Sequence, residues 1–289
     1  MGHLLRRASP FLLLAGSFWL LYGAVVRHLV HDWMRDENYS HGFLIVPLAL
    51  YFVWERRRRL AAVAVAPSNL GLVIVLGSLG VLLAGVLGAE LFLTRVSLIG
   101  LVAGSIVFLL GWRALRVLAF PVALLLLMIP IPALIFNQIA FPLQLLASQV
   151  GETALRTLDV PVLREGNVIV LANTSLEVAE ACSGIRSLIS LLTLGIVYGY
   201  FCDPRGGVRI AIALSTIPIA IASNGLRVAG TGIAAHYIGP EAAQGFFHTF
   251  SGWLMFVAAF VMLFVVVRLI LRLAPRRIAT ETLPGAVVA

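Results

Sequence analysis

Long apolar segments recur along almost the whole of this sequence, and they leave little room for any architecture outside a membrane. The chain has 289 residues, of which 61% are hydrophobic and only 12% are charged. A water-soluble domain cannot hide that much apolar surface, and about 20 consecutive apolar residues are what a helix needs to cross a bilayer. The sequence therefore predicts an all-α polytopic membrane protein.

We count eight apolar runs and expect about eight transmembrane helices. The runs cover residues 11–26, 42–54, 70–89, 91–111, 117–136, 185–201, 210–228 and 249–267. The first could be a signal peptide, but no convincing cleavage site follows it, so we interpret it as a helix. The second is short for a span, and prolines in the fifth predict a kink. Two GxxxG pairs, Gly100/Gly104 and Gly195/Gly199, predict close packing between helices.

The longest polar stretch, residues 137–181, separates the fifth run from the sixth. Its first half, about residues 138–158, has the apolar spacing of an interfacial helix. Its second half predicts a β-hairpin, with strands at 168–171 and 176–179 and a turn near Asn173-Thr174. We expect one integral membrane domain over residues 1–279, with 137–181 as an extracytoplasmic insert. Residues 280–289 are expected to form a disordered cytoplasmic tail.

The chain has 21 arginines and no lysine, and the distribution of the arginines predicts the orientation in the membrane. With eight spans both termini lie on one side, and about two thirds of the arginines fall there, which makes that side cytoplasmic. Without the short second span the bias would reverse. The net charge of +8 therefore reports orientation. Nucleic-acid binding is not expected, because the sequence has no basic domain with interleaved aromatic residues outside the apolar runs.

Three reactive side chains fall at the outer ends of three consecutive helices in this topology. Cys182 lies in or near the first turn of the sixth helix, Arg227 closes the seventh and His248 opens the eighth. Neighbouring helices pack about 8–10 Å apart, so these side chains can meet. A helix N-terminus favours a thiolate. Together they provide a nucleophile, a proton carrier and a cation, which is what thiol-based acyl transfer requires.

Two further residues are candidates for supporting roles. Arg186 could face the same site or anchor its helix, and Asn224 could orient Arg227 or cap backbone, with the cap favoured. The remaining outer histidines have no second reactive group beside them at a helix mouth and are weaker candidates: His28, His31, His41 and His236.

No metal or cofactor is expected. Cys182 and Cys202 lie at opposite ends of one helix, about 30 Å apart and beyond disulfide reach. Neither cysteine has the Cys/His spacing of a zinc site.

Several motifs resemble the exosortase/archaeosortase family. They are residues 180–188 (Glu-Ala-Cys-Ser-Gly-Ile-Arg-Ser-Leu), residues 224–227 (Asn-Gly-Leu-Arg) and then His248 before the last run. Residues 39–42 (Tyr-Ser-His-Gly) and 164–167 (Arg-Glu-Gly-Asn) are also similar to bacterial exosortases. The resemblance covers about residues 20–270.

This resemblance implies a multi-pass enzyme of the bacterial inner membrane, with both termini cytoplasmic and the active site periplasmic. It would be a cysteine transpeptidase or protease that cleaves C-terminal sorting signals of exported proteins. Such PEP-CTERM signals carry a short Pro-Glu-Pro-like motif, a transmembrane helix and a basic tail. The enzyme would form an acyl thioester and pass the protein to an acceptor that the sequence does not identify. Membrane lipid is the other expected partner.

The resemblance maps a Cys, Arg, His triad onto Cys182, Arg227 and His248. In the family the arginine is usually given the proton-donor role and the histidine transition-state support. A guanidinium holds its proton too firmly to be a good donor. We therefore expect His248 to transfer the proton and Arg227 to stabilise negative charge.

Two alternatives compete with the enzyme. Proton- or ion-coupled transporters usually place a carboxylate near the membrane midplane, whereas no Asp, Glu or Lys lies deep in any run and no repeat is evident. A non-catalytic membrane component of exopolysaccharide export is the other alternative. Loss of function in Cys182→Ala would separate the enzyme from both.

Overall fold

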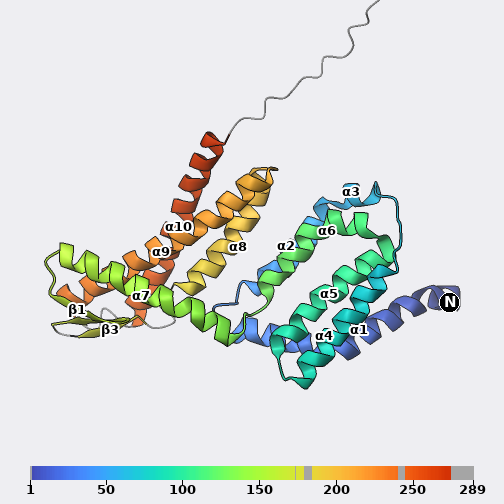
Figure 1. Cartoon of the computed structure of the whole chain (residues 1–289), viewed down its shortest axis with the longest axis horizontal. Coiled ribbons are helices and arrows are strands. Elements are labelled where there is room, and N and C mark those ends of the chain that lie inside the picture. Colours follow the sequence, from blue (N-terminus) through green and yellow to red (C-terminus); the bar gives the residue numbers. More distant parts are fainter. Residues whose placement is uncertain (1, 173, 179–183, 240–244, 275–289) are drawn as a thin grey trace, which may run out of the picture. The chain divides into compact units, whose positions relative to one another are not determined.

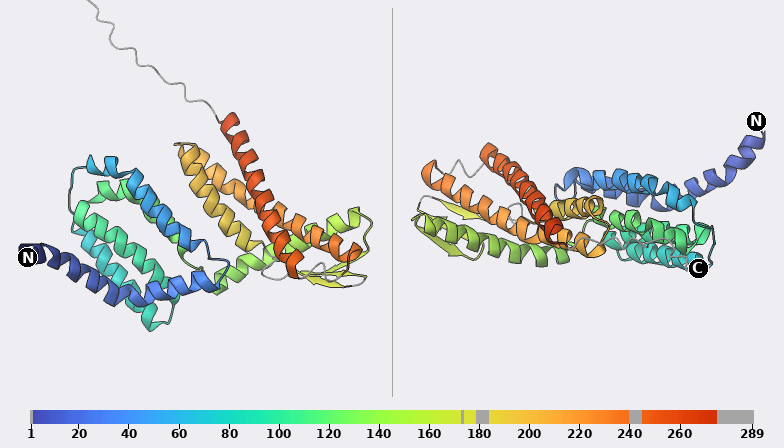
Figure 2. Two further views of the ribbon diagram at one scale, coloured as in Figure 1. Left: turned by 180° about the vertical axis from the view of Figure 1, so that it is seen from behind. Right: turned by 90° about the horizontal axis from the view of Figure 1, so that it is seen from above.

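The computed structural model describes residues 2–172, 174–178, 184–239 and 245–274 (Figure 1). The described chain is mainly helical, with one small three-stranded sheet. It divides into two compact units, residues 1–139 and 140–289, and two further views of their elements are given in Figure 2. We describe each unit by itself.

The first unit is entirely helical in its described part. Its helices are α1 (Gly2–Arg35), α2 (Gly42–Glu55), α3 (Arg57–Ala61), α4 (Leu70–Leu87), α5 (Leu91–Leu110), α6 (Trp112–Leu124) and the 3₁₀ helix η1 (Leu125–Met128). Helices α4 and α5 form a tight hairpin because small residues line their contact. Gly71, Ser78 and Gly85 are buried along α4, and a β-carbon added at Gly104 of α5 would lie 2.9 Å from the backbone nitrogen of Val75.

The turn between α1 and α2 holds the first unit together through the Tyr-Ser-His-Gly motif. The hydroxyl of Tyr39 accepts a hydrogen bond from the backbone N–H of Ile131 at 3.0 Å. The His41 ring nitrogen Nε2 lies 3.1 Å from the carbonyl oxygen of Leu127. Gly42 packs against the Trp33 indole, where an added β-carbon would lie 2.5 Å from Cε2. This motif therefore ties the turn to η1 and to the segment that follows it.

The second unit contains the sheet and the last three helices. Its elements are α7 (Ala133–Thr157, which begins in the first unit), β1 (Val162–Glu165), β2 (Val168–Leu171), β3 (Ser175–Glu177), α8 (Ile185–Cys202), α9 (Gly206–Tyr237) and α10 (Gly245–Leu273). The sheet is antiparallel in the order β1-β2-β3. Glu165 pairs with Val168, so Gly166 and Asn167 form a two-residue turn, and Gly166 takes the positive φ of 65° that such turns need.

Two hydrophobic cores organise the second unit, and α9 contributes to both. Its N-terminal half packs with α8 and α10 around Leu191, Ile212 and Leu263. Its C-terminal half packs with α7 and the sheet around Leu155 and Ile169. The middle of α9 is therefore the place where the helical core meets the core beneath the sheet.

The prediction of an all-α polytopic membrane protein is confirmed. Six helices in the described residues are long and apolar enough to cross a membrane, namely α4, α5, α7, α8, α9 and α10 from Gly252, and α2 is a shorter apolar helix. Helices α2, α4, α5 and α8 match the predicted runs within two residues. The predicted close packing of both GxxxG pairs is also confirmed: added β-carbons would lie 2.9 Å from α4 at Gly104 and 2.5 Å from Thr216 Cγ2 of α9 at Gly195.

The predicted fifth helix over residues 117–136 is wrong. Helix α6 begins at Trp112, continues into η1 and stops, and α7 begins only at Ala133. Pro130 and Pro132 account for the break, because proline lacks the N–H donor and restrains the residue before it. Helix α7 then runs without interruption through the segment predicted to be interfacial.

Further boundaries differ from the prediction, and α1 covers Gly2–Arg35 where residues 11–26 were predicted. Strand β1 was missed, so the predicted hairpin is the second half of a three-stranded sheet. Helix α9 continues to Tyr237, well past its predicted end at residue 228. This extension is stabilised by burial of Val228 and Ala235 against α7 and the sheet. The predicted tail at 280–289 lies outside the described residues.

Candidate active site at the start of α8

The segment that carries Cys182, residues 179–183, lies outside the described part of the chain. The residues on both sides of it are described. Val178 follows β3, and Gly184 is the N-cap of α8, which begins at Ile185. In the sequence, Cys182 is three positions before Ile185, so the predicted placement of its side chain in or near the first turn falls outside the described residues.

Gly184 packs against Asn224 of α9. A β-carbon added at Gly184 would lie 2.7 Å from Asn224 Cγ and 3.0 Å from its Nδ2. Gly184 also has a φ of 78°, which favours glycine. The Asn224 residue is buried, with only 5% of its surface exposed. The start of α8 is thus fixed against the middle of α9 by a contact that only glycine permits.

The Arg-Glu-Gly-Asn motif fixes the other side of the same segment. The Asn167 amide donates from Nδ2 to the Val178 carbonyl oxygen at 3.3 Å, and the Val178 N–H donates to the Asn167 carbonyl oxygen at 2.9 Å. Arg164 donates from Nε to Glu152 Oε2 on α7 at 2.8 Å. The chain is therefore anchored through the sheet to α7 immediately before it enters residues 179–183.

Arg227 lies on α9, three residues after Asn224, and is partly buried. Its guanidinium approaches α10, because a β-carbon added at Gly252 would lie 3.4 Å from Arg227 Nη2. The two helices are also joined by a hydrogen bond from Ser223 Oγ to the Met255 carbonyl oxygen at 2.8 Å. Arg227 thus extends to the first turns of α10.

The backbone of His248 lies in α10, one helical turn before Gly252. Residues four apart in a helix share a face. Position 248 is therefore on the face of α10 that meets Arg227, while the His248 side chain lies outside the described part. Arg186, the second residue of α8, is partly buried.

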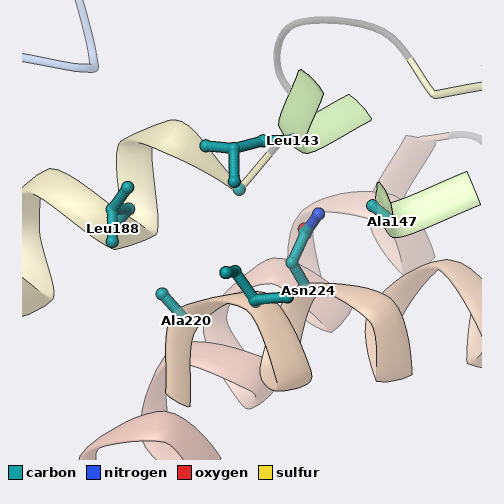
Figure 3. A pocket seen from close by; sticks show the side chains of 7 residues that line it. Leu143, Ala147, Leu188, Ala220 and Asn224 are labelled. Carbon is teal, nitrogen blue, oxygen red and sulfur yellow. The ribbon is translucent and has the colours of Figure 1, made fainter. Parts of the chain in front are cut away.

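A small cavity opens beside the contact between Gly184 and Asn224 (Figure 3). It has a volume of about 10 Å³. Its walls come from three helices of the second unit and are apolar except for one amide: Leu143 and Ala147 of α7, Gly184 and Leu188 at the start of α8, and Ala220, Ile221 and Asn224 of α9.

The opposite end of α8 is strongly basic and carries the other cysteine. Cys202 is the last residue of α8, followed by Asp203, which accepts from Arg205 Nε at 2.9 Å and Nη2 at 2.7 Å. These hydrogen bonds lower the pKa of Asp203 from 3.8 to about 2. Arg209 donates from Nε to the Asp203 carbonyl oxygen at 2.6 Å. This ion-paired turn fixes the connection between α8 and α9.

The other histidines predicted to be weaker candidates lie elsewhere. His28 and His31 line a separate cavity of the first unit together with Arg27 and Asp32, and His236 stacks edge-on against Tyr237. In the described part of the chain, no group of three or more His, Cys, Asp and Glu side chains could hold a metal ion.

Three residues that position the site were missed from the sequence: Gly184, Asn167 and Gly252. The first two lie inside the quoted motifs, and a glycine just before an apolar helix was a usable signal for the Gly184 turn. Gly252 carries no such signal, because its importance comes only from the approach of Arg227 across a helix contact.

A family model described as transmembrane exosortase (Exosortase_EpsH) matches residues 33–265 of the chain. No curated protein and no solved structure matches this chain. The matched range begins near the end of α1, reaches into α10 and includes Cys182, Arg227 and His248.

Proposed function

Because this chain belongs to the transmembrane exosortase family, we propose that it is a cysteine transpeptidase that cleaves C-terminal sorting signals through a thioester at Cys182. The observation that carries the proposal is the pair of contacts made by α9. Asn224 holds Gly184 at the start of α8, and Arg227 reaches Gly252 on α10. The two α9 residues lie three apart and so share one side of the helix.

Chain connectivity supports a role for Cys182 at this place. Two peptide units separate it from Gly184, and consecutive α-carbons are 3.8 Å apart, so its α-carbon lies within about 7.6 Å of that of Gly184. The segment of five residues from 179 to 183 is held at both ends, by Asn167 through Val178 and by Asn224 through Gly184. Such anchoring favours a nucleophile held in one orientation.

The first half-reaction forms the thioester. The Cys182 thiolate attacks the carbonyl carbon of the scissile peptide bond, and Arg227 stabilises the oxyanion because a guanidinium stays cationic. Collapse of this intermediate breaks the C–N bond. The departing amine takes a proton from the His248 imidazolium. An imidazolium is a better proton donor near neutral pH than a guanidinium.

The second half-reaction releases the product. An acceptor nucleophile gives its proton to the now neutral His248 and attacks the thioester carbon, and the C–S bond breaks to regenerate the thiolate. With an amine acceptor the reaction is transpeptidation, and with water it is hydrolysis. Both pass through the same thioester, so the chemistry at Cys182 is common to them.

We place the protein in the bacterial inner membrane, with the triad on the periplasmic side and both termini in the cytoplasm. Basic residues mark cytoplasmic ends. In the second unit, Arg205 and Arg209 lie at the connection between α8 and α9, and Arg268 and Arg272 lie near the C-terminal end of α10. A substrate with its own transmembrane helix and a basic cytoplasmic tail would present the residues before that helix at the level of the triad.

The deciding experiment traps the thioester. The full-length protein is co-expressed with a reporter that ends in a Pro-Glu-Pro-like motif, an apolar helix and an arginine-rich tail. We expect a covalent adduct between enzyme and reporter that hydroxylamine releases and that is absent in Cys182→Ala. Mass spectrometry of the reporter that the enzyme processes without hydroxylamine then distinguishes an acceptor from water.

Cys202→Ala is the matched control, because this second cysteine lies at the other end of α8. It should leave both adduct and processing unchanged. Processing that continues in Cys182→Ala, with the wild-type and variant proteins equally abundant in the membrane, would refute the proposal and favour a non-catalytic role.

A further inference from the structure

We infer that the cavity between α7, α8 and α9 is a specificity subsite that accepts a small apolar side chain of the substrate, at a residue flanking the scissile bond. The inference rests on the proposed function and names a substrate feature that the reaction selects. The lining of the cavity includes Gly184, which is two residues after Cys182 in the chain. A peptide carbonyl under attack by Cys182 would bring its neighbouring side chains to this region.

The chemistry of the walls selects apolar groups. Six of the seven lining residues are aliphatic side chains or glycine: Leu143, Ala147, Gly184, Leu188, Ala220 and Ile221. A polar or charged side chain would lose its water there without gaining enough hydrogen bonds in return. The Asn224 amide projects among these side chains (Figure 3), and polar groups in such pockets fix the orientation of a ligand.

The volume selects small groups. About 10 Å³ is roughly the space that one water molecule or one methyl group needs. An alanine methyl fits, whereas the side chain of leucine requires the walls to move. One methylene in such a pocket changes the specificity by a factor of about 10–200. We therefore expect a clear preference for alanine over leucine at one substrate position.

Leu188 is the residue whose truncation should change this preference. It lies in the first turn of α8, lines the cavity and packs on the core between α8, α9 and α10. In Leu188→Ala the cavity gains the space of the missing isopropyl group. Ile221→Val is a milder second variant that also enlarges the lining, and it guards against failure of the first to fold.

Leu194→Ala is the matched control. Leu194 lies on the same helix and packs against the same core as Leu188, but it does not line the cavity. The two truncations should have similar costs in stability. A difference between them in substrate preference therefore reports the cavity.

The experiment uses the reporter described above, in which each of the three residues on either side of the cleavage site is changed in turn to alanine or leucine. In the wild type, leucine should lower processing at least about ten-fold at one of these positions. Leu188→Ala should reduce that penalty about ten-fold, Ile221→Val should reduce it less, and Leu194→Ala should leave it unchanged.

Two results would overturn the inference while leaving the proposed function intact. One is Cys182-dependent processing with no penalty for leucine at any position. The other is an equal change of preference in Leu188→Ala and Leu194→Ala. Processing that does not depend on Cys182 would instead remove the proposed function and the subsite with it.

Discussion

Gly184 and Asn224 touch so closely that no side chain fits between them. An added β-carbon at Gly184 would lie 2.7 Å from Asn224 Cγ and 2.8 Å from its Cβ. This contact joins the N-terminus of α8 to the middle of α9, in the helix where Arg227 follows three residues later. It therefore links the segment that carries Cys182 to the helix that carries Arg227.

Gly184→Ala should abolish processing in a protein that still inserts into the membrane. The methyl group must displace Asn224, and the φ of 78° costs an alanine roughly 1–2 kcal/mol in addition. We expect a loss of at least about 100-fold in reporter cleavage, measured against the amount of enzyme in the membrane. Gly207→Ala on α9 is the control, because a β-carbon there meets nothing within 4 Å. Equal activity in both variants would contradict the importance of the contact.

Asn167→Ala should weaken processing by a smaller factor. The change removes the hydrogen bond from Nδ2 to the Val178 carbonyl oxygen, whose net contribution is about 1 kcal/mol, so the anchored form of the segment should lose about five-fold in population. The rate of reporter cleavage in membranes is the measurement. Asn137→Ala removes an exposed asparagine of α7 instead and should leave the rate unchanged.

Gly252→Leu should be far more damaging than Gly252→Ala. The first carbon of a side chain at Gly252 already lies 3.4 Å from Arg227 Nη2, so an alanine fits with a slight adjustment, while a leucine must push the guanidinium aside. Reporter cleavage should fall less than about ten-fold for alanine and at least about 100-fold for leucine. Gly230→Leu on the exposed side of α9 has open space and should cleave normally. If Gly252→Leu keeps wild-type activity, the approach of Arg227 to α10 has no role in the reaction.

The sequence predicted helices well where each apolar run is bounded by a turn, and poorly where tertiary packing decides the boundary. Helix α8 was placed within one residue, because the turn at Asp203-Pro204 ends it. The end of α9 was missed by nine residues, because its extension is stabilised by distant partners such as Leu155 and Ile169. Strand β1 was missed because its pairing depends on β2.

The candidate site shows the same division. Motif order drew attention to Cys182, Arg227 and His248, but no spacing rule could show that Gly184 touches Asn224 or that Gly252 faces Arg227. Those contacts join residues 25 and 40 positions apart in the chain, and they depend on how helices pack. Their signal in the sequence is a glycine, which is compatible with many other roles.

Gly42→Ala should destabilise the first unit. An added methyl group would overlap the Trp33 indole, which is buried and donates from Nε1 to the Met128 carbonyl oxygen at 2.9 Å. Overpacking of this kind typically costs about 1–3 kcal/mol. The thermal unfolding midpoint of the purified protein in detergent should fall by several degrees. Gly77→Ala on α4 meets open space and should leave the midpoint unchanged or slightly raised. Equal midpoints for the two variants would show that the turn can adjust.

Asp203 should make the α8–α9 turn sensitive to acid. Its hydrogen bonds with Arg205 lower the pKa in the folded protein from 3.8 to about 2, so the folded state favours the charged carboxylate. The stabilisation is complete above about pH 5, where Asp203 is ionised in both states, and it is lost as the pH falls from about 5 towards 2. Asp203→Asn removes this dependence and should unfold at a lower temperature than the wild type at pH 5. The two midpoints should converge as the pH approaches 2. Because the other carboxylates titrate equally in both proteins, a difference that stays constant between pH 5 and pH 2 would show that the ion pair with Arg205 does not stabilise the turn.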